Sequence, residues 1–243
     1  MTKLIAIGDI HGRTIWKDIV KNEKPSTVLF IGDYFDSYDI SCKDQLNNFE
    51  EIMQFKEASN GTDVIMLWGN HEHHYMRDHE CYSGYQHQNA RVINAALNHA
   101  RQMDYLDIAY SIDDLLFTHA GVSATWLKTH LKFSTMDTLV VDLNILFRHN
   151  LSAFDFAGWS YTGDSEISSP IWIRHASLLS ANKKHSIKKH FRQVVGHTMM
   201  EDVNLDVYNK WLGGRYIPID GLAQGQYLIY ENKALSVGKI EIT

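Results

Sequence analysis

Polar clusters follow apolar runs at five places along this chain, and their residue types are those that bind metal ions or transfer protons. The clusters are Gly8-Asp9-Ile10-His11-Gly12, Gly32-Asp33-Tyr34-Phe35-Asp36, Gly69-Asn70-His71-Glu72, Thr118-His119-Ala120-Gly121 and Gly196-His197-Thr198. Oxygen ligands mixed with imidazoles suit Mn²⁺, iron or Zn²⁺, whereas an all-oxygen set would suit Mg²⁺ or Ca²⁺. The set is large enough for two ions, which would share one carboxylate to stay about 4 Å apart.

The third cluster combines two kinds of chemistry within three residues. The apolar run Val64–Trp68 predicts a buried strand, and Gly69 lets the backbone turn sharply after it. Asn70 offers a neutral carbonyl oxygen that a metal could use, and His71 an imidazole that can gain or lose a proton near neutral pH. Alone, this segment also fits a strand followed by an ordinary polar turn, so the other clusters decide its interpretation.

The elements that must position these clusters alternate between extended and helical patterns. The runs Lys3–Ile7 and Thr27–Ile31 predict strands, and apolar residues spaced by three and four from Ile15 to Val20 predict a helix between them. This pattern is typical of a parallel crossover unit. In open α/β sheets ligands bind at the carboxyl ends of the strands, which is where the clusters fall.

The rest of the chain continues this alternation. Leu46–Met53 and Val92–Met103 predict helices, and Ile108–Ile112 with Leu115–Phe117 predicts a hairpin. Residues 123–191 are mostly helical in pattern, and we expect this section to cover the site in part. The last part predicts an antiparallel or mixed second sheet from Val203–Tyr208, Arg215–Ile219, Tyr227–Glu231 and Ala234–Val237.

Composition limits the class of protein. A chain of 243 residues, with 44% apolar residues, three prolines and no low-complexity tract, predicts a single domain over residues 1–243. Cys42 and Cys81 fit a reducing compartment, and no signal-peptide or membrane-spanning run is present, so we expect a cytoplasmic protein without membrane contact. The net charge of -6 disfavours nucleic acid as a partner, although the basic stretch at 183–192 leaves local contact open. The oligomeric state is not predicted.

In their order along the chain, the five clusters resemble the motif series of the calcineurin-like metallophosphoesterases. Within them the chain is similar to the phosphoprotein phosphatase branch and its bacterial and phage relatives, over residues 8 to about 221. The resemblance implies an α/β fold, a four-layer α-β-β-α sandwich with two mixed sheets. It also implies a hydrolase of phosphate esters with two divalent ions, in which metal-bound hydroxide attacks the phosphorus directly. Mn²⁺ is the first choice of ion, with Zn²⁺, Fe²⁺/Fe³⁺ or Ni²⁺ as alternatives.

The resemblance also implies a role for individual residues. His71 would be the general acid that protonates the leaving oxygen, and Asp36 would orient its imidazole. Arg174 is the best candidate for the arginine that binds phosphate oxygens, and Arg13 is a second one. Asp33 would bridge both ions. The implied metal ligands are Asp9 and His11 for the first ion, Asp33 for both, and Asn70, His119 and His197 for the second.

One departure from the family pattern affects the expected substrate. Where the family usually has Asp-Arg-Gly, this chain has Asp36-Ser37-Tyr38. A guanidinium binds a phosphate dianion through two parallel hydrogen bonds, which a serine hydroxyl cannot replace. Either Arg13 or Arg174 takes its place, or the substrate needs less positive charge, as a diester does.

We therefore predict a phosphomonoesterase, with a Ser/Thr protein phosphatase as one form, acting on a phosphorylated protein, nucleotide or small molecule. Two alternatives stay open. One is a phosphodiesterase or dinucleoside polyphosphate hydrolase with the same metals. The other belongs to a different class, a non-catalytic scaffold that binds metal.

Overall fold

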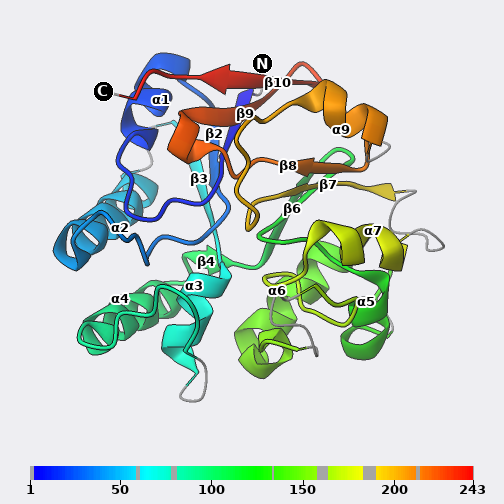
Figure 1. The fold of residues 1–243 in the computed structure, drawn as a ribbon, viewed down its shortest axis with the longest axis horizontal. Helices are drawn as coiled ribbons and strands as arrows, with labels where there is room; N and C mark the ends of the chain where they lie inside the picture. The colour runs from blue at the N-terminus through cyan, green and yellow to red at the C-terminus, as the bar shows by residue number, and fades with distance from the viewer. Residues whose placement is uncertain are drawn as a thin grey trace.

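The computed structural model describes residues 3–58, 61–77, 81–132, 134–157, 164–182, 190–211 and 214–242. In this part of the chain the strands form a six-stranded sheet, β10-β9-β1-β2-β3-β4, and a four-stranded sheet, β5-β6-β7-β8 (Figure 1). The strands are β1 (Lys3–Ile7), β2 (Thr27–Phe30), β3 (Asp63–Leu67), β4 (Leu106–Asp107), β5 (Ala109–Ile112), β6 (Leu115–Thr118), β7 (Arg192–Val195), β8 (Tyr216–Pro218), β9 (Gln226–Glu231) and β10 (Ala234–Lys239).

Helices connect and cover these strands. They are α1 (Trp16–Glu23), α2 (Cys42–Glu57), α3 (Asn70–His73), α4 (Ala90–Gln102), α5 (Ala124–His130), α6 (Leu139–His149), α7 (His175–Asn182) and α9 (Leu205–Trp211), with 3-10 turns η1 (His74–Met76), η2 (Leu151–Phe154) and η3 (Leu222–Gln224). Each sheet contains parallel and antiparallel pairs: β1, β2, β3 and β4 run parallel while β9 is antiparallel to β1, and β6, β7 and β8 run parallel while β5 is antiparallel to β6. The predicted α/β fold with two mixed sheets is confirmed.

Successive side chains of the central strands point to opposite faces of the sheet, and this alternation creates the layers. In β1, Leu4 and Ala6 pack between the two sheets, where Phe117 and Val194 of the second sheet meet them. The alternate residues of β1 pack on the opposite face, in the cluster that includes residues of α1 and α2. On the outer side of the second sheet, residues next to β6 and in β8 pack against α7. The four layers are therefore helices, sheet, sheet and helices, because both faces of the first sheet are apolar.

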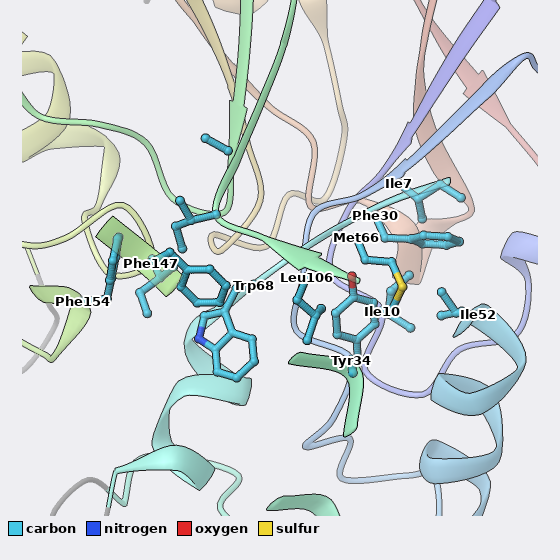
Figure 2. Packing of buried hydrophobic residues seen from close by; sticks show 14 of the residues in the cluster. Ile7, Ile10, Phe30, Tyr34, Ile52, Met66, Trp68, Leu106, Phe147 and Phe154 are labelled. Carbon is cyan, nitrogen blue, oxygen red and sulfur yellow. The ribbon is translucent and has the colours of Figure 1, made fainter. Parts of the chain in front are cut away.

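The helical section joins the same core at the end of β3. The ring of Trp68, which directly follows that strand, lies 5.3 Å from the ring of Phe147 in α6, centroid to centroid (Figure 2). Tyr34 lies on the other side of this view, near Ile10 and Met66. Buried aromatic side chains at the ends of these strands therefore support the loops that carry the polar clusters.

Two expectations for the C-terminal part are wrong. Residues Val203–Tyr208 were expected to form a strand, but a helix, α9, begins at Leu205. Asn204 Oδ1 accepts hydrogen bonds from the backbone N–H groups of Asp206 (3.1 Å) and Val207 (3.2 Å), which is how an N-cap starts a helix. Val203 and Val207 would lie on the same face of a strand, yet Val203 is buried and Val207 is exposed, so the burial does not follow strand alternation.

The second error concerns sheet membership. Of the C-terminal strands in the described residues, β8 alone joins the second sheet, whereas β9 pairs with β1 and β10 pairs with β9 in the first. Alternation in a sequence shows which residues face one side, but it does not show which strand lies next door.

The basic stretch falls mostly outside the described residues, which do not include Lys183, Lys184, Lys188 and Lys189. Arg192, the last of that group, begins β7 and pairs with Asp114 through two nitrogens, at 2.7 and 2.9 Å. No helix in the described part of the chain has the length and apolar content that a membrane crossing needs.

Candidate active site

The carboxyl ends of strands from both sheets meet at one place. The loops after β1 and β2 are joined by a hydrogen bond from the His11 N–H to the Asp33 carbonyl (2.6 Å), and those after β6 and β7 by one from the Gly196 N–H to the His119 carbonyl (2.7 Å). His119 Nδ1 connects the sheets by donating to the carbonyl of Ile31, at 2.9 Å. Backbone groups therefore hold the loops that carry the polar clusters.

The donor atoms of the predicted ligands gather around Asp33. Asp33 Oδ2 lies 3.9 Å from His11 Nε2 and 3.4 Å from His119 Nε2, and these two histidines belong to different groups of possible ligand atoms that share Asp33. Asn70 Oδ1 lies 2.8 Å from both His119 Nε2 and His197 Nδ1. Two atoms that share an ion at about 2.1 Å are at most about 4.2 Å apart, so these distances fit a pair of ions with Asp33 between them.

The three imidazoles are oriented as metal ligands usually are. Each places one ring nitrogen against a backbone carbonyl: His11 Nδ1 at 2.5 Å from Phe35 O, His119 Nδ1 at Ile31 O, and His197 Nε2 at 3.1 Å from Trp172 O. A neutral imidazole that donates from one nitrogen presents a lone pair at the other. Carbonyl contacts of this kind fix the tautomer and the ring orientation of histidines that bind metal.

This orientation provides a test of whether a metal fits. The lone pairs of His119 and His197 both face Asn70 Oδ1, which is itself an acceptor. An amide oxygen that faces two imidazole nitrogens at this distance is stabilised by added protons or by a cation between them. Two carboxylates, an amide oxygen and three imidazoles are a donor set for Mn²⁺, iron or Zn²⁺. The residues present therefore fit divalent ions.

Asp9 completes the group from the end of β1. It is 3% exposed, and both of its oxygens lie 3.1 Å from the backbone nitrogen of His197, which donates to them. Burial and the neighbouring Asp220 raise the pKa of Asp9 well above its usual value. A buried carboxyl whose charge is this unfavourable is stabilised in its ionised form by a cation.

Close approach of the loops depends on two glycines. A Cβ at Gly69 would lie 2.2 Å from Asp33 Oδ1, and one at Gly196 would lie 2.2 Å from Asp9 Oδ1. Any side chain at these positions would displace a carboxylate. The glycines therefore leave room for the two predicted carboxylate ligands.

The backbone is strained at several of these positions. His11, Asp33, Asp36 and His197 have positive φ angles of 41°, 52°, 68° and 63°. Left-handed conformations of residues other than glycine are uncommon and cost on the order of 1–3 kcal/mol each. The contacts of the surrounding loops must offset this cost, and such strain is frequent at functional sites.

Glu72 makes some of the contacts that offset the cost of this backbone strain. Its carboxylate is fully buried and accepts from the backbone N–H groups of Gly69 (2.9 Å), Asp33 (2.8 Å) and Tyr34 (2.7 Å). Burial and the nearby Asp33 charge raise the pKa of Glu72 to about 7. Glu72 lies in the third cluster, where the sequence indicates no role for it, and the structure places it as a bridge between the loops after β2 and β3.

His71 lies beside this group and pairs with Asp36. Its Nδ1 is 2.8 Å from Asp36 Oδ2, and its Nε2 is 3.9 Å from Asp33 Oδ2. Burial lowers the pKa of His71, but the Asp33 charge and the hydrogen bond to Asp36 outweigh it and raise that pKa to about 9. In the metal-free protein His71 therefore carries a proton at neutral pH.

Asp36 is held by residues that the sequence did not indicate. The Tyr75 hydroxyl donates to Asp36 Oδ1, and Gln86 Nε2 donates to the same oxygen at 3.2 Å. His74 Nε2 lies 2.7 Å from Asp36 Oδ2. Tyr75 and His74 come just after the third cluster, so their proximity to it was a usable signal, but nothing in the sequence singled out Gln86.

Asp220 is another residue that the sequence analysis missed. It was assigned to a turn, yet it follows β8, which runs parallel to β7, so it reaches the same sheet edge. Burial and the nearby Asp33 raise the pKa of Asp220 to about 6, and its carboxyl shares a hydrogen bond with Asp9. The rule that found the other clusters, a polar residue directly after an apolar run, would have found this one too.

The two candidate arginines lie in different surroundings. Arg174 Nη1 donates to the carbonyl of His197 (2.8 Å) and to Thr198 Oγ1 (3.1 Å), and the side chain borders a cavity that Asn70 and His71 also line. Arg13 lines a separate cavity on the α1 side, although its charge still acts on His11. Of the two, Arg174 is nearer to the group formed by His71 and Asn70.

Comparison with protein families shows what kind of protein carries this site. A profile described as calcineurin-like phosphoesterase matches residues 2–208, most of the chain. The chain belongs to the calcineurin-like phosphoesterase family. A search of the curated proteins finds no significant match. Membership confirms the expectation of a metal-dependent phosphoesterase.

Solved structures show the same fold for this calcineurin-like phosphoesterase. A cold-active protein-tyrosine phosphatase from a Shewanella species has a TM-score of 0.66 at 20% identity, over 98% of this chain and 78% of that one. A protein serine/threonine phosphatase from Saccharomyces cerevisiae has a TM-score of 0.59 at 16% identity, over 100% and 80% of the two chains. A metallophosphoesterase from Sphaerobacter thermophilus has a TM-score of 0.51 at 12% identity, over 100% and 90%.

Proposed function

We propose that this phosphoesterase hydrolyses phosphate monoesters at a centre of two divalent ions, with Mn²⁺ as the first choice, and without a covalent intermediate. The observation that supports two ions is that Asp33 belongs to two groups of possible ligand atoms, one that contains His11 and one that contains His119 and His197. In this proposal Asp33 contacts both ions. Asp9 and His11 complete the first set of ligands, and Asn70, His119 and His197 complete the second.

The bound ions supply an activated water, by lowering its pKa from about 15.7 towards about 7, and they neutralise charge on the phosphate oxygens. The chain supplies the proton for the leaving group. His71 donates it from Nε2, while Asp36 accepts the Nδ1 hydrogen and fixes the ring. A general acid of this kind typically accelerates a reaction by about 10²–10⁴-fold.

Arg174 is the proposed phosphate-binding residue. Its contacts with His197 O and Thr198 Oγ1 hold the guanidinium beside His197, which would be a ligand of the second ion. A guanidinium there would bring positive charge and planar donors to a phosphate dianion. Arg13 is retained as the weaker proposal, because it lines another cavity.

A diester or dinucleoside polyphosphate is the second candidate substrate, because Ser37 stands where the family usually has arginine. The similar structures from Shewanella and yeast are those of protein phosphatases, whose substrates are monoesters, and this supports the monoester proposal. We also propose a single domain over residues 1–243 and a cytoplasmic location. The free thiols of Cys42 and Cys81 support the proposed location.

A substrate panel tests the proposed function. Metal-stripped protein is reconstituted with Mn²⁺, Zn²⁺, Fe²⁺, Ni²⁺ or Mg²⁺, and rates are measured on a monoester, a diester and a pyrophosphate. We expect the highest kcat/KM on the monoester with Mn²⁺ and about two ions bound per chain. A preference for the diester or pyrophosphate would favour the second candidate, and no turnover with no bound ion would favour a non-catalytic scaffold.

A further inference from the structure

A cavity of about 270 Å³ lies beside His71, and much of its wall is aromatic. We call it the aromatic pocket, defined by Tyr82, Phe156 and Trp172, with His71 and Arg174 also lining it. These rings come from three segments that are far apart in the sequence. The pocket is therefore a product of the fold rather than of one local motif.

The three rings support one another. Tyr82 and Trp172 lie 4.6 Å apart between centroids, Phe156 and Trp172 lie 5.1 Å apart, and Tyr82 and Phe156 lie 5.2 Å apart. The angles between ring planes are 65°, 87° and 45°, so Tyr82 and Phe156 each meet Trp172 edge to face, as aromatic pairs prefer, and are tilted relative to one another. Another aromatic ring could enter such a group with the same geometry.

Trp172 links the pocket to the proposed metal site. It is only 6% exposed, and its carbonyl oxygen lies 3.1 Å from His197 Nε2. Its ring lies 6.1 Å from the His197 ring, in an edge-to-face arrangement. One wall of the pocket is thus placed at a fixed distance from a proposed ligand.

The pocket lies on the side of the site that carries the proposed acid. Gly84, two residues after Tyr82, is so close that an added Cβ would lie 2.8 Å from Asp36 Cβ and 3.4 Å from His71 Cε1. The segment that carries Tyr82 therefore covers the His71–Asp36 pair. A substrate whose leaving oxygen faces His71 would direct the group attached to that oxygen into the aromatic pocket.

We propose that the aromatic pocket receives the ring of an aryl phosphate monoester, such as the phosphorylated side chain of a tyrosine. This inference rests on the proposed function, because it takes His71 as the acid. The volume is near the lower end of the roughly 300–1,000 Å³ of pockets for drug-sized ligands, and it is sufficient for one ring. An alkyl group, as in a phosphorylated serine, would gain none of the ring contacts.

The reaction balances with water as the only co-reactant. A water oxygen forms a bond to phosphorus while the bond from phosphorus to the phenolic oxygen breaks. The proton from His71 goes to the departing phenolate, and the proton lost by the water restores His71 or passes to solvent. The products are inorganic phosphate and a phenol.

Substitutions that remove a ring test the pocket. Tyr82→Leu and Phe156→Leu replace half-buried rings with apolar side chains, and Tyr82→Phe keeps the ring. Tyr110→Leu is the control, because Tyr110 is a half-buried aromatic residue of β5 that does not line the pocket. For each protein kcat/KM is measured on phenyl phosphate and on propyl phosphate with saturating Mn²⁺, and the ratio is compared with that of the parent chain. Differences in leaving-group reactivity cancel in this comparison.

We expect the ratio to fall about 3- to 10-fold in each leucine variant, the size that one aromatic pair implies. It should stay unchanged in Tyr82→Phe and Tyr110→Leu. Equal losses on the two esters would overturn the proposal. So would a greater loss on uridine monophosphate than on phenyl phosphate, since the pocket would then hold a base.

Binding of unreactive analogues separates this proposal from the proposed function. Benzylphosphonate and propylphosphonate are titrated into the Mn²⁺-loaded protein by calorimetry. Tighter binding of benzylphosphonate, lost in Phe156→Leu, supports the pocket even if no ester is hydrolysed, in which case the proposed function alone has failed. Equal affinity for both phosphonates overturns the aromatic pocket while leaving hydrolysis in place.

Discussion

The two sides of the candidate site are built in different ways. On the side of the proposed metal ligands, each residue directly follows or lies close to a strand end, and backbone groups hold several of them: the Ile31 carbonyl orients His119, the Trp172 carbonyl orients His197, and the His197 N–H holds Asp9. On the side of the proposed acid, side chains hold side chains. Asp36 is contacted by His71, Tyr75 and Gln86, and the last of these comes from an irregular segment.

This difference suggests how the two sides tolerate change. Backbone positions of a sheet edge vary little when one side chain is replaced, so loss of a metal ligand should remove chemistry without disturbing its neighbours. A network of side chains has several members that partly replace one another, so single substitutions there should have graded effects. The predictions below test this contrast, from the largest expected effect to the smallest.

Replacing the shared carboxylate should have the largest effect. Asp33→Asn keeps the shape and tolerates the positive φ of 52°, because asparagine adopts that conformation readily, but it removes the charge between the two sets of ligands. We expect loss of at least one ion per chain and no detectable activity on any ester, measured by elemental analysis and by the substrate panel. Asp113→Asn, at a φ of 49° in the turn after β5, is the matched control. Full metal content with a full rate in Asp33→Asn would contradict a bridging role.

Replacing the proposed acid should affect some substrates and not others. His71→Asn removes the proton donor, so we expect a loss of about 10²–10⁴-fold on an alkyl phosphate and a much smaller loss on an activated aryl phosphate. Metal content should not change, since His71 is outside the proposed ligand set. If both esters slow equally, His71 is not the acid. If the ions are lost, the proposed acid and the proposed metal ligands are not two independent sides of the site.

Replacing Glu72 tests the hydrogen bonds that join the loops after β2 and β3. These two loops carry residues of both sides of the site. Glu72→Gln offers one acceptor oxygen to three backbone N–H groups that now share a carboxylate. An unsatisfied buried group costs about 1–3 kcal/mol, and changes beside ligands weaken metal binding by about 10–100-fold. We expect both effects, measured by urea unfolding of the metal-free protein and by metal titration. Glu51→Gln, at an exposed ion pair with Lys17, should change neither.

The same contrast explains what could be predicted from the sequence. The six proposed ligands follow apolar runs, and parallel strands bring their carboxyl ends to one edge, so local patterns were enough to group them. Asp36 received its role from the family resemblance alone. Gln86 and the aromatic pocket depend on contacts between segments that are distant in the chain and lack periodic structure, for which a single sequence holds no signal. The strand predicted at Val203–Tyr208 failed for a related reason, since the capping contact of Asn204 outweighed the alternating pattern.

The smallest effect is expected for a side chain that positions Asp36 without touching substrate. Tyr75→Phe removes the hydroxyl that donates to Asp36 Oδ1 and accepts from the Gln86 N–H at 2.9 Å, while the ring can remain stacked on Tyr85 at 4.7 Å. A hydrogen bond to a charged group contributes about 1.5–3 kcal/mol, but Gln86 still donates to the same oxygen, so we expect only about a 3- to 10-fold fall in kcat on alkyl phosphates.

The pattern of that loss identifies its cause. If Tyr75 acts through Asp36 and His71, the fall in kcat should be larger for an alkyl phosphate than for an activated aryl phosphate, with KM and metal content unchanged. Tyr105→Phe removes a comparable hydroxyl contact, to Glu57 at the surface, and should leave kcat on both esters as it is. Equal losses on the two esters in Tyr75→Phe would mean that the hydroxyl stabilises the loop generally. The side-chain network would then be a structural support, and the graded response expected on the acid side would belong to folding rather than to proton transfer.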